Sequence, residues 1–335
     1  MIRDSQSIID GFAANPFDTL SLASVITRFP GGKTSICGGV LIAPSIVLTA
    51  AHCVFINDEF ALTAKVTVGD MNLSTQDERE QEFRSHAMAI SKVFSKGASE
   101  ANDDVSVIFL PKRPRVCENA ASLQIAQLPS TWSLSFQETP KVLSQFQLEN
   151  SVCYIVGWGK TENRTANHSE GVRQMMVKLS FRKIGKRKYM IARGIVESSR
   201  ACMGDSGSPV YCFAEGKRVL VGIVAQIGSF VKMSQQNSAD HISFCRDFEF
   251  MFVSDWRESA GRVAEILENY GELHQLNEGQ KMCYGDVHSF NLNWENKQIM
   301  IDGKKLSNLL FADDIVLISH SSAELQSMVN DLDNV

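Results

Sequence analysis

The strongest constraint on the fold is a succession of short apolar segments separated by turns. From Ile8 to about Trp256, runs rich in Val, Ile and Leu are bounded by Gly, Pro, Asn and Ser. This pattern is typical of many-stranded all-β domains. It predicts strands at Val40–Ile42, Ile46–Thr49, Lys65–Gly69, Val105–Leu110, Val152–Gly157, Gln174–Ser180, Val210–Cys212 and Val219–Ala225.

The apolar period changes near the end of this region. Side chains recur at helical spacing at Trp256, Ala260, Val263, Ile266, Leu267 and Tyr270. One amphipathic helix is therefore predicted to close the domain.

Cysteine usage and the N-terminal segment point to different compartments. Eight cysteines in 335 residues indicate an oxidising compartment. Residues 1–7 lack the apolar region that a secretory signal needs. We interpret them as the remnant of a propeptide or of a truncated N-terminus, and predict an extracellular protein whose signal peptide is missing from this sequence. Sequons at Asn72, Asn163 and Asn167 would then accept N-linked glycans.

Charge and hydropathy exclude two classes of partner. A net charge of −5 gives no sign of nucleic-acid or membrane-surface binding. No apolar run reaches the ~18–20 residues that span a bilayer. We expect no nucleic-acid partner and no membrane partner.

Two strings far apart in the chain carry the candidate chemistry. They are Thr49-Ala50-Ala51-His52-Cys53 and Cys202-Met203-Gly204-Asp205-Ser206-Gly207-Ser208-Pro209. A serine hydroxyl is a poor nucleophile at neutral pH, and it needs a base within reach and a group that orients the base. Two candidate carboxylates, Asp103 and Asp104, lie between the strings and directly precede the strand at Val105–Leu110.

The order His, Asp, Ser in these contexts resembles the trypsin/chymotrypsin family of serine proteases. The resemblance implies an all-β fold of two packed six-stranded antiparallel β-barrels with a C-terminal helix, over about residues 8–270. It implies that Ser206 is the nucleophile, His52 the general base and Asp104 the orienting carboxylate. The alternative is that both aspartates lie in a solvated turn.

The same resemblance assigns roles around the serine. The backbone N–H groups of Gly204 and Ser206 would form the oxyanion hole. Ser208 departs from the pattern, since the family usually has glycine there. Asp205 would pair with an α-amino group released at Ile8, where Ile8-Ile9-Asp10-Gly11 matches the mature start of the family. Ser7 departs from the Arg or Lys that a trypsin-like activator requires.

Three disulfides follow from the resemblance. They are Cys37–Cys53, Cys153–Cys212 and Cys202–Cys245. Cys117 has no obvious partner, and Cys283 lies outside the predicted protease domain. Free buried cysteines are the alternative.

Substrate specificity departs from that of trypsin. In the family that the chain resembles, the residue six positions before the nucleophile lies at the base of the primary pocket, where an aspartate selects Arg or Lys; here that residue is Arg200. A buried cation there would repel basic side chains and favour Asp or Glu; alternatively, Arg200 turns away into solvent or an internal ion pair. Gln226, Ile227 and Gly228 are the candidate pocket walls.

The C-terminal segment, residues 293–335, resembles a different family. Phe311-Ala312-Asp313-Asp314 within an apolar run is similar to the palm hairpin of reverse transcriptases from non-LTR retrotransposons, followed by a helix-like stretch at Ser322–Leu332. Two-metal nucleotidyl transfer needs further carboxylates, and the rest of the palm and the fingers are absent upstream. We expect a short foreign α/β fragment, joined through residues 271–292, without polymerase activity.

The sequence thus predicts a serine endopeptidase that is not specific for Arg or Lys. A catalytically inactive protease-like binding module in a chimeric gene product is the alternative. We expect no cofactor and no metal, a protein or peptide substrate, protease inhibitors as further partners, and a monomer.

Overall fold

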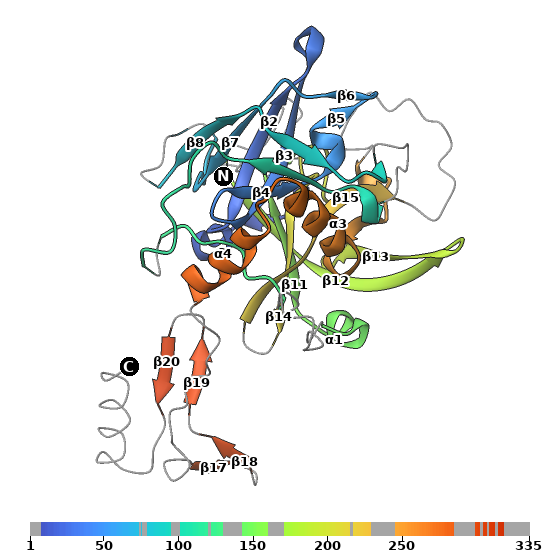
Figure 1. Ribbon diagram of the computed structural model, residues 1–335. Coiled ribbons are helices and arrows are strands. Elements are labelled where there is room, and N and C mark those ends of the chain that lie inside the picture. The colour runs from blue at the N-terminus through green and yellow to red at the C-terminus, as the bar shows by residue number, and fades with distance from the viewer. Residues whose placement is uncertain are drawn as a thin grey trace. The chain divides into compact units, whose positions relative to one another are not determined.

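A computed structural model describes residues 8–73, 75, 79–94, 101–119, 122–129, 143–159, 171–214, 217–228 and 245–284, together with four short strands between residues 299 and 317. The structure is mostly β and divides into two compact units, of which the larger runs through Tyr284 (Figure 1). None of the described helices is long and apolar enough to cross a membrane.

The first sheet is an antiparallel half-barrel in the order β8-β7-β2-β3-β4-β10-β9. Its strands are β2 (Leu22–Arg28), β3 (Thr34–Ala43), β4 (Ile46–Thr49), β7 (Thr63–Val68), β8 (Gln81–Ser85), β9 (Met88–Ile90) and β10 (Ser106–Phe109). A small hairpin, β5 (Phe55–Ile56) and β6 (Glu59–Phe60), follows the helical turn η3 (Ala51–Cys53). Only two residues separate the edge strands β8 and β9 in the chain, so the sheet bends round to bring its edges together.

The second sheet closes on itself. Its order is β1-β12-β11-β14-β15-β16-β13, and a further β12–β13 pairing completes a six-stranded barrel with β1 at its side. The strands are β1 (Phe12–Ala13), β11 (Cys153–Gly157), β12 (Arg173–Ile184), β13 (Arg187–Gly194), β14 (Pro209–Ala214), β15 (Lys217–Gly228) and β16 (Phe250–Asp255). All eight predicted strands are present. The expected double-barrel fold is therefore confirmed, with the first barrel only half closed.

Helices and helical turns fill the connections. These are η1 (Pro16–Thr19), η2 (Pro30–Gly32), η5 (Ala101–Asp103), α1 (Gln145–Glu149), α3 (Trp256–Asn269) and α4 (His274–Tyr284). Asp255 caps α3 by accepting a hydrogen bond from the Arg257 N–H, and Trp256, Val263 and Leu267 are buried. The predicted closing helix is confirmed.

Helix α4 is an element that the sequence did not predict. It packs against β3 of the first barrel, where the side chain of Gln275 accepts hydrogen bonds from the backbone and hydroxyl of Ser45. The compact unit therefore continues to Tyr284, beyond residue 270, where the sequence placed the end of the domain.

The second compact unit contains residues 285–335 and is described by itself. Its described backbone forms two antiparallel hairpins. These are β17 (Ile299–Ile301) with β18 (Lys304–Leu306) and β19 (Asn308–Phe311) with β20 (Asp314–Leu317). Asp313 and the helix expected at Ser322–Leu332 lie outside the described residues.

Candidate active site

His52 and Asp104 are brought together by the register of two strands. β4 and β10 pair antiparallel, with Thr49 opposite Ser106. His52 follows β4 by three residues, and Asp104 precedes β10 by two, so both emerge at the same end of the ladder. Asp104 Oδ2 lies 2.7 Å from His52 Nδ1, and Asp104 Oδ1 accepts a hydrogen bond of 2.9 Å from the His52 backbone N–H.

This pair sets the electrostatics of the imidazole. Asp104 is fully buried, whereas 37% of the His52 side chain is exposed. Burial disfavours the imidazolium, but the charge of Asp104 and its hydrogen bond outweigh that penalty and raise the pKa of His52. A carboxylate bonded to Nδ1 holds the proton there in the neutral ring, which leaves Nε2 as the basic nitrogen.

Ser206 lies in a turn of the second barrel that docks on the first. Its carbonyl oxygen accepts a hydrogen bond of 2.8 Å from Gly38 N and lies 3.9 Å from the sulfur of Cys53, the neighbour of His52. A Cβ on Gly207, whose φ is +79°, would lie 2.3 Å from Thr49 Oγ1. No hydrogen bond joins the Ser206 hydroxyl to His52 among the described residues; such bonds are often long before substrate binds.

Two backbone N–H groups of the same turn have no hydrogen-bond acceptor among the described residues. Asp205 N donates to Cys202 O and Ser208 N donates to Asp205 O, but the N–H groups of Gly204 and Ser206 donate to no described residue. Gly204 has a φ of +99°, and a Cβ there would lie 3.0 Å from Gly159 Cα. The close packing on Gly159 and the left-handed backbone therefore both require glycine at 204.

Asp205 is a buried carboxylate that has no cationic partner among the described residues. It accepts hydrogen bonds from Gly159 N at 2.8 Å and Cys202 N at 2.9 Å. Burial raises its pKa to about 7, although the two backbone hydrogen bonds act in the opposite direction. Ile8 is fully buried with the second-barrel core. Because Ile8 is joined to Ser7, it has no amino group, and no ion pair with Asp205 forms among the described residues.

Four disulfides are present, three of them as expected: Cys37–Cys53, Cys153–Cys212 and Cys202–Cys245. The fourth joins Cys117 to Cys283, the residue that the sequence placed outside the domain. Assigning the three expected pairs leaves only these two of the eight cysteines, so elimination alone could have found this bond.

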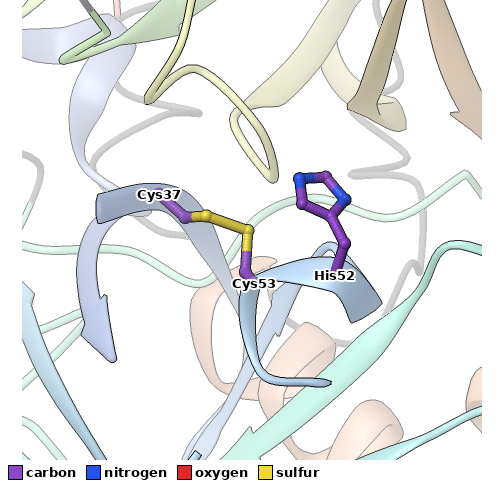
Figure 2. A group of neighbouring side chains, drawn as sticks. All are labelled: Cys37, His52 and Cys53. Atoms are coloured by element: carbon purple, nitrogen blue, oxygen red, sulfur yellow. A yellow bond between two sulfur atoms is a disulfide. The ribbon is translucent and has the colours of Figure 1, made fainter. Parts of the chain in front are cut away.

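The Cys37–Cys53 bond lies directly beside the His52 ring (Figure 2). Donor atoms of Cys37, His52 and Cys53 lie within 4.8 Å of one another, a spacing that could hold a metal ion. The two sulfurs are bonded to each other, however, and a metal ligand must be a thiolate. The cluster therefore does not fit a metal.

The guanidinium of Arg200 donates hydrogen bonds to backbone carbonyl groups of neighbouring loops. Nε donates to Phe248 O at 2.9 Å, and Nη1 donates to Ser199 O at 2.9 Å and to Glu197 O. All of these acceptors are backbone carbonyl groups, and the place of Arg200 at the base of the primary pocket stays a prediction. Its backbone N–H donates to Ile9 O at 3.0 Å, which joins the segment after Ile8 to the residues before the serine turn.

The predicted pocket walls lie at the end of β15. Gln226 is exposed, and Ile227 packs against the Cys202–Cys245 disulfide. Gly228 pairs with Phe250 on β16, and a Cβ on Gly228 would lie 2.8 Å from the Phe250 ring. Sequence reasoning missed Phe250, because only the β15–β16 register places it beside these walls.

Sequence reasoning also missed the role of Asp103. Its fully buried carboxylate forms ion pairs with Arg187 of β13 at 3.1 Å and with Arg262 of α3 at 2.5 Å. The two adjacent aspartates therefore face different partners: Asp104 contacts His52, and Asp103 ties the same loop to the second barrel and to α3.

Comparisons with known proteins bear on the family and the fold. The model of the family "Trypsin" matches residues 19–244. Chymotrypsin-like elastase family member 1 of Homo sapiens is 25% identical over 230 residues, covering 66% of this chain and 82% of that protein. Chymotrypsin-like elastase family member 3B of Macaca mulatta is 26% identical, covering 68% and 84%.

A solved structure described as "Structure of GrC" has the same fold. It aligns with a TM-score of 0.53 and 20% identity, over 79% of this chain and all of that one. The family match covers more than half of the 335 residues and contains His52, Asp104 and Ser206. The chain therefore belongs to the trypsin family.

Proposed function

We propose that this protein is a serine endopeptidase that hydrolyses peptide bonds through an acyl-enzyme. The observation that carries the proposal is the 2.7 Å contact between His52 Nδ1 and the buried Asp104 carboxylate, beside the turn that presents Ser206. Ser206 Oγ attacks the carbonyl carbon of the scissile bond while His52 Nε2 takes its proton. His52 then returns the proton to the leaving amine, and water hydrolyses the ester by the same route.

The two open N–H groups supply the electrostatic part of the mechanism. The oxygen of the tetrahedral intermediate becomes negative and accepts hydrogen bonds from Gly204 N and Ser206 N. A donor of this kind contributes about 3 kcal/mol to transition-state stabilisation. Both groups belong to the turn that carries the nucleophile, so the proposed donors and the proposed nucleophile are held by the same segment.

Activation would require a new amino group at Ile8. A carboxylate without a cation in an apolar site is unfavourable, and the raised pKa of Asp205 reflects this cost. Cleavage between Ser7 and Ile8 would create an ammonium group in the same barrel. Its pairing with Asp205 would fix the turn that contains Gly204 and Ser206.

The substrate preference would differ from that of trypsin. No carboxylate stands at position 200, and the Arg200 guanidinium donates to loop carbonyls. A basic side chain would find no counter-charge there, so cleavage would not be specific for Arg or Lys. The four disulfides favour an extracellular protein, whose partners would be protein substrates and protease inhibitors, and which would act as a monomer.

The reverse-transcriptase resemblance of residues 293–335 stays a prediction. The trypsin-family match ends at residue 244 and does not bear on this segment. We propose no catalytic role for Asp313 and Asp314.

The test uses the full chain with an engineered cleavage site before Ile8, so that processing leaves a free amine. Cleaved protein and its Ser206→Ala variant are incubated with a peptide library, and with a fluorophosphonate probe that labels activated serines. We expect hydrolysis and labelling by the first protein only. Equal rates for the two proteins would contradict the proposal, provided that both have the same unfolding midpoint.

A further inference from the structure

A hairpin of the second barrel carries a concentration of positive charge that the proposed chemistry does not use. β12 and β13 form one antiparallel ladder from Val177 opposite Gly194 to Ile184 opposite Arg187, and its tip extends away from the barrel (Figure 1). Residues 171–196 contain eight Lys and Arg residues and no Asp or Glu, in a chain whose net charge is −5. The positive charge is therefore concentrated on the β12–β13 hairpin, although the whole chain is acidic.

Five of these residues form what we call the basic hairpin surface. All five side chains are exposed, and within the described part of the chain the ion pairs of this hairpin are made by Arg187 and Arg193 and not by these five: Lys178, Arg182, Lys183, Lys186 and Lys188. Two other cations of the hairpin are neutralised, because Arg187 pairs with Asp103 and Arg193 with Glu249 at 3.7 Å. The basic hairpin surface therefore keeps its charge in the folded protein.

The register of the ladder sets like charges opposite one another. Lys178 faces Arg193 across the two strands, and Lys183 faces Lys188. Like charges directly opposite in a sheet destabilise it. Side chains alternate between the two faces of a strand, so Lys178 and Arg182 lie on one face of the hairpin, whereas Lys183 and Lys188 lie on the other. Arg193 is already paired with Glu249, so the uncompensated repulsion lies between Lys183 and Lys188 near the tip. An anion with several charges along a flexible chain that passes around the protruding hairpin would relieve it and would contact the cations of both faces.

The aromatic side chains of the hairpin limit which polyanion fits. The Phe181 ring is covered by Lys188 Nζ at 5.4 Å and by the Arg257 guanidinium at 4.6 Å. Tyr189 packs edge-to-face on Phe252, with ring centroids 5.6 Å apart. Neither ring is free to stack on a base, which is how proteins hold single-stranded nucleic acid. The hairpin would therefore bind a polyanion through ion pairs alone. This favours a polymer whose anionic groups are exposed along its length and which needs no ring stacking.

We propose that the basic hairpin surface binds a sulfated polysaccharide. The four disulfides assign the protein to an oxidising compartment, and the lysine ammonium groups bind sulfate as point charges without a bidentate geometry. Binding does not depend on proteolytic activity, so it can be tested in the Ser206→Ala protein.

The experiment measures binding of full-length Ser206→Ala protein to immobilised heparin at several salt concentrations. The test variant adds Lys178→Gln, Lys183→Gln and Lys186→Gln. The matched control removes three exposed cations of the first barrel with Lys33→Gln, Arg84→Gln and Lys112→Gln. Both triple variants change the net charge equally, so a general effect of charge cancels. Their unfolding midpoints establish that both are folded.

We expect the hairpin variant to bind heparin at least about tenfold more weakly, with a shallower dependence on salt, because three exposed charge contacts are lost. The control should bind as the parent does, and desulfated heparin should not bind. Equal binding by the two triple variants would overturn the site. If the Ser206→Ala protein bound poly-glutamate or single-stranded DNA as tightly as heparin or more tightly, the assignment to a sulfated polysaccharide would be overturned.

Discussion

At the scale of single residues, the site depends on two adjacent aspartates with different partners. Asp104 hydrogen-bonds to the ring and backbone of His52, whereas Asp103 pairs with two arginines. Position before a strand favoured Asp104 in the sequence. The partners of Asp103 were invisible there, because Arg187 lies 84 residues away and reaches it only through the packing of β13 against the loop.

Exchanging each aspartate for asparagine should separate the two roles. In the activated protein, Asp104→Asn should lower kcat by roughly 10⁴-fold, because His52 loses the group that holds its tautomer. Asp103→Asn should change kcat by less than tenfold but lower the free energy of unfolding by about 1–3 kcal/mol, because two ion pairs lose their partner. Peptide hydrolysis and urea unfolding measure these two effects.

The pH profile gives an independent readout of the same pair. His52 accepts a proton only as neutral imidazole, so kcat/KM should be lost as the pH falls through its raised pKa. Asp104→Asn removes the charge that raises the pKa, and the residual activity should persist to lower pH. An equal loss of kcat in both aspartate variants would contradict our assignment.

At the scale of elements, strands and the closing helix were readable from the sequence, but α4 was not. β4, β10, β11 and β12 are Val-, Ile- and Met-containing runs that bury alternate or successive side chains. Helix α4 instead docks largely through polar groups. Gln280 accepts from Leu128 N and donates to Ala126 O, and Gly279 lies against Pro44 and Ile125. Such contacts leave no apolar period in the sequence.

Removing the bond that anchors α4 should lower stability without changing activity. The double variant Cys117→Ser/Cys283→Ser opens a loop of 166 residues, which typically costs about 2–5 kcal/mol. Because α4 packs on β3 and no residue assigned to the reaction belongs to it, kcat of the activated protein should stay unchanged. Thermal unfolding and peptide hydrolysis check the two halves of this prediction; Gln280→Ala, which keeps the disulfide, is the milder control.

At the scale of the whole molecule, the separate parts of the site were predictable, but the contacts between the barrels were not. The strings around His52 and Ser206 belong to different barrels, and the resemblance supplied their roles. The hydrogen bond from Gly38 N to Ser206 O and the fit of Gly207 against Thr49 arise only when the serine turn docks on β3. Within the second barrel, Asp205 is buried where it accepts hydrogen bonds from Gly159 N and Cys202 N, so its protonation becomes a property of the folded chain.

The uncleaved protein should therefore lose stability as the pH rises. An unfolded chain releases the Asp205 proton near pH 4, whereas the folded chain keeps it until about pH 7. Between these values the folded state binds more protons, so the free energy of unfolding should fall by a few kcal/mol. Denaturant unfolding at pH 5 and pH 8 measures this difference, with the protein cleaved before Ile8 and Asp205→Asn as comparisons.

Pairing of a new Ile8 ammonium with Asp205 would remove most of this pH dependence, and Asp205→Asn would remove it in the uncleaved chain. A slope that is the same in all three proteins would show that another group is responsible.

The disulfide between Cys117 and Cys283 also determines which part of the protein would carry a pulling force applied to the C-terminal segment. Cys283 is covalently joined to Cys117, and Tyr284 beside it donates a hydrogen bond to Ile125 O. Tension on residues 285–335 reaches Cys283 before it reaches α3, and the disulfide passes part of it to Cys117. Any partner that pulls on the C-terminal segment would therefore pull on a covalent anchor of the first barrel as well as on helix α4.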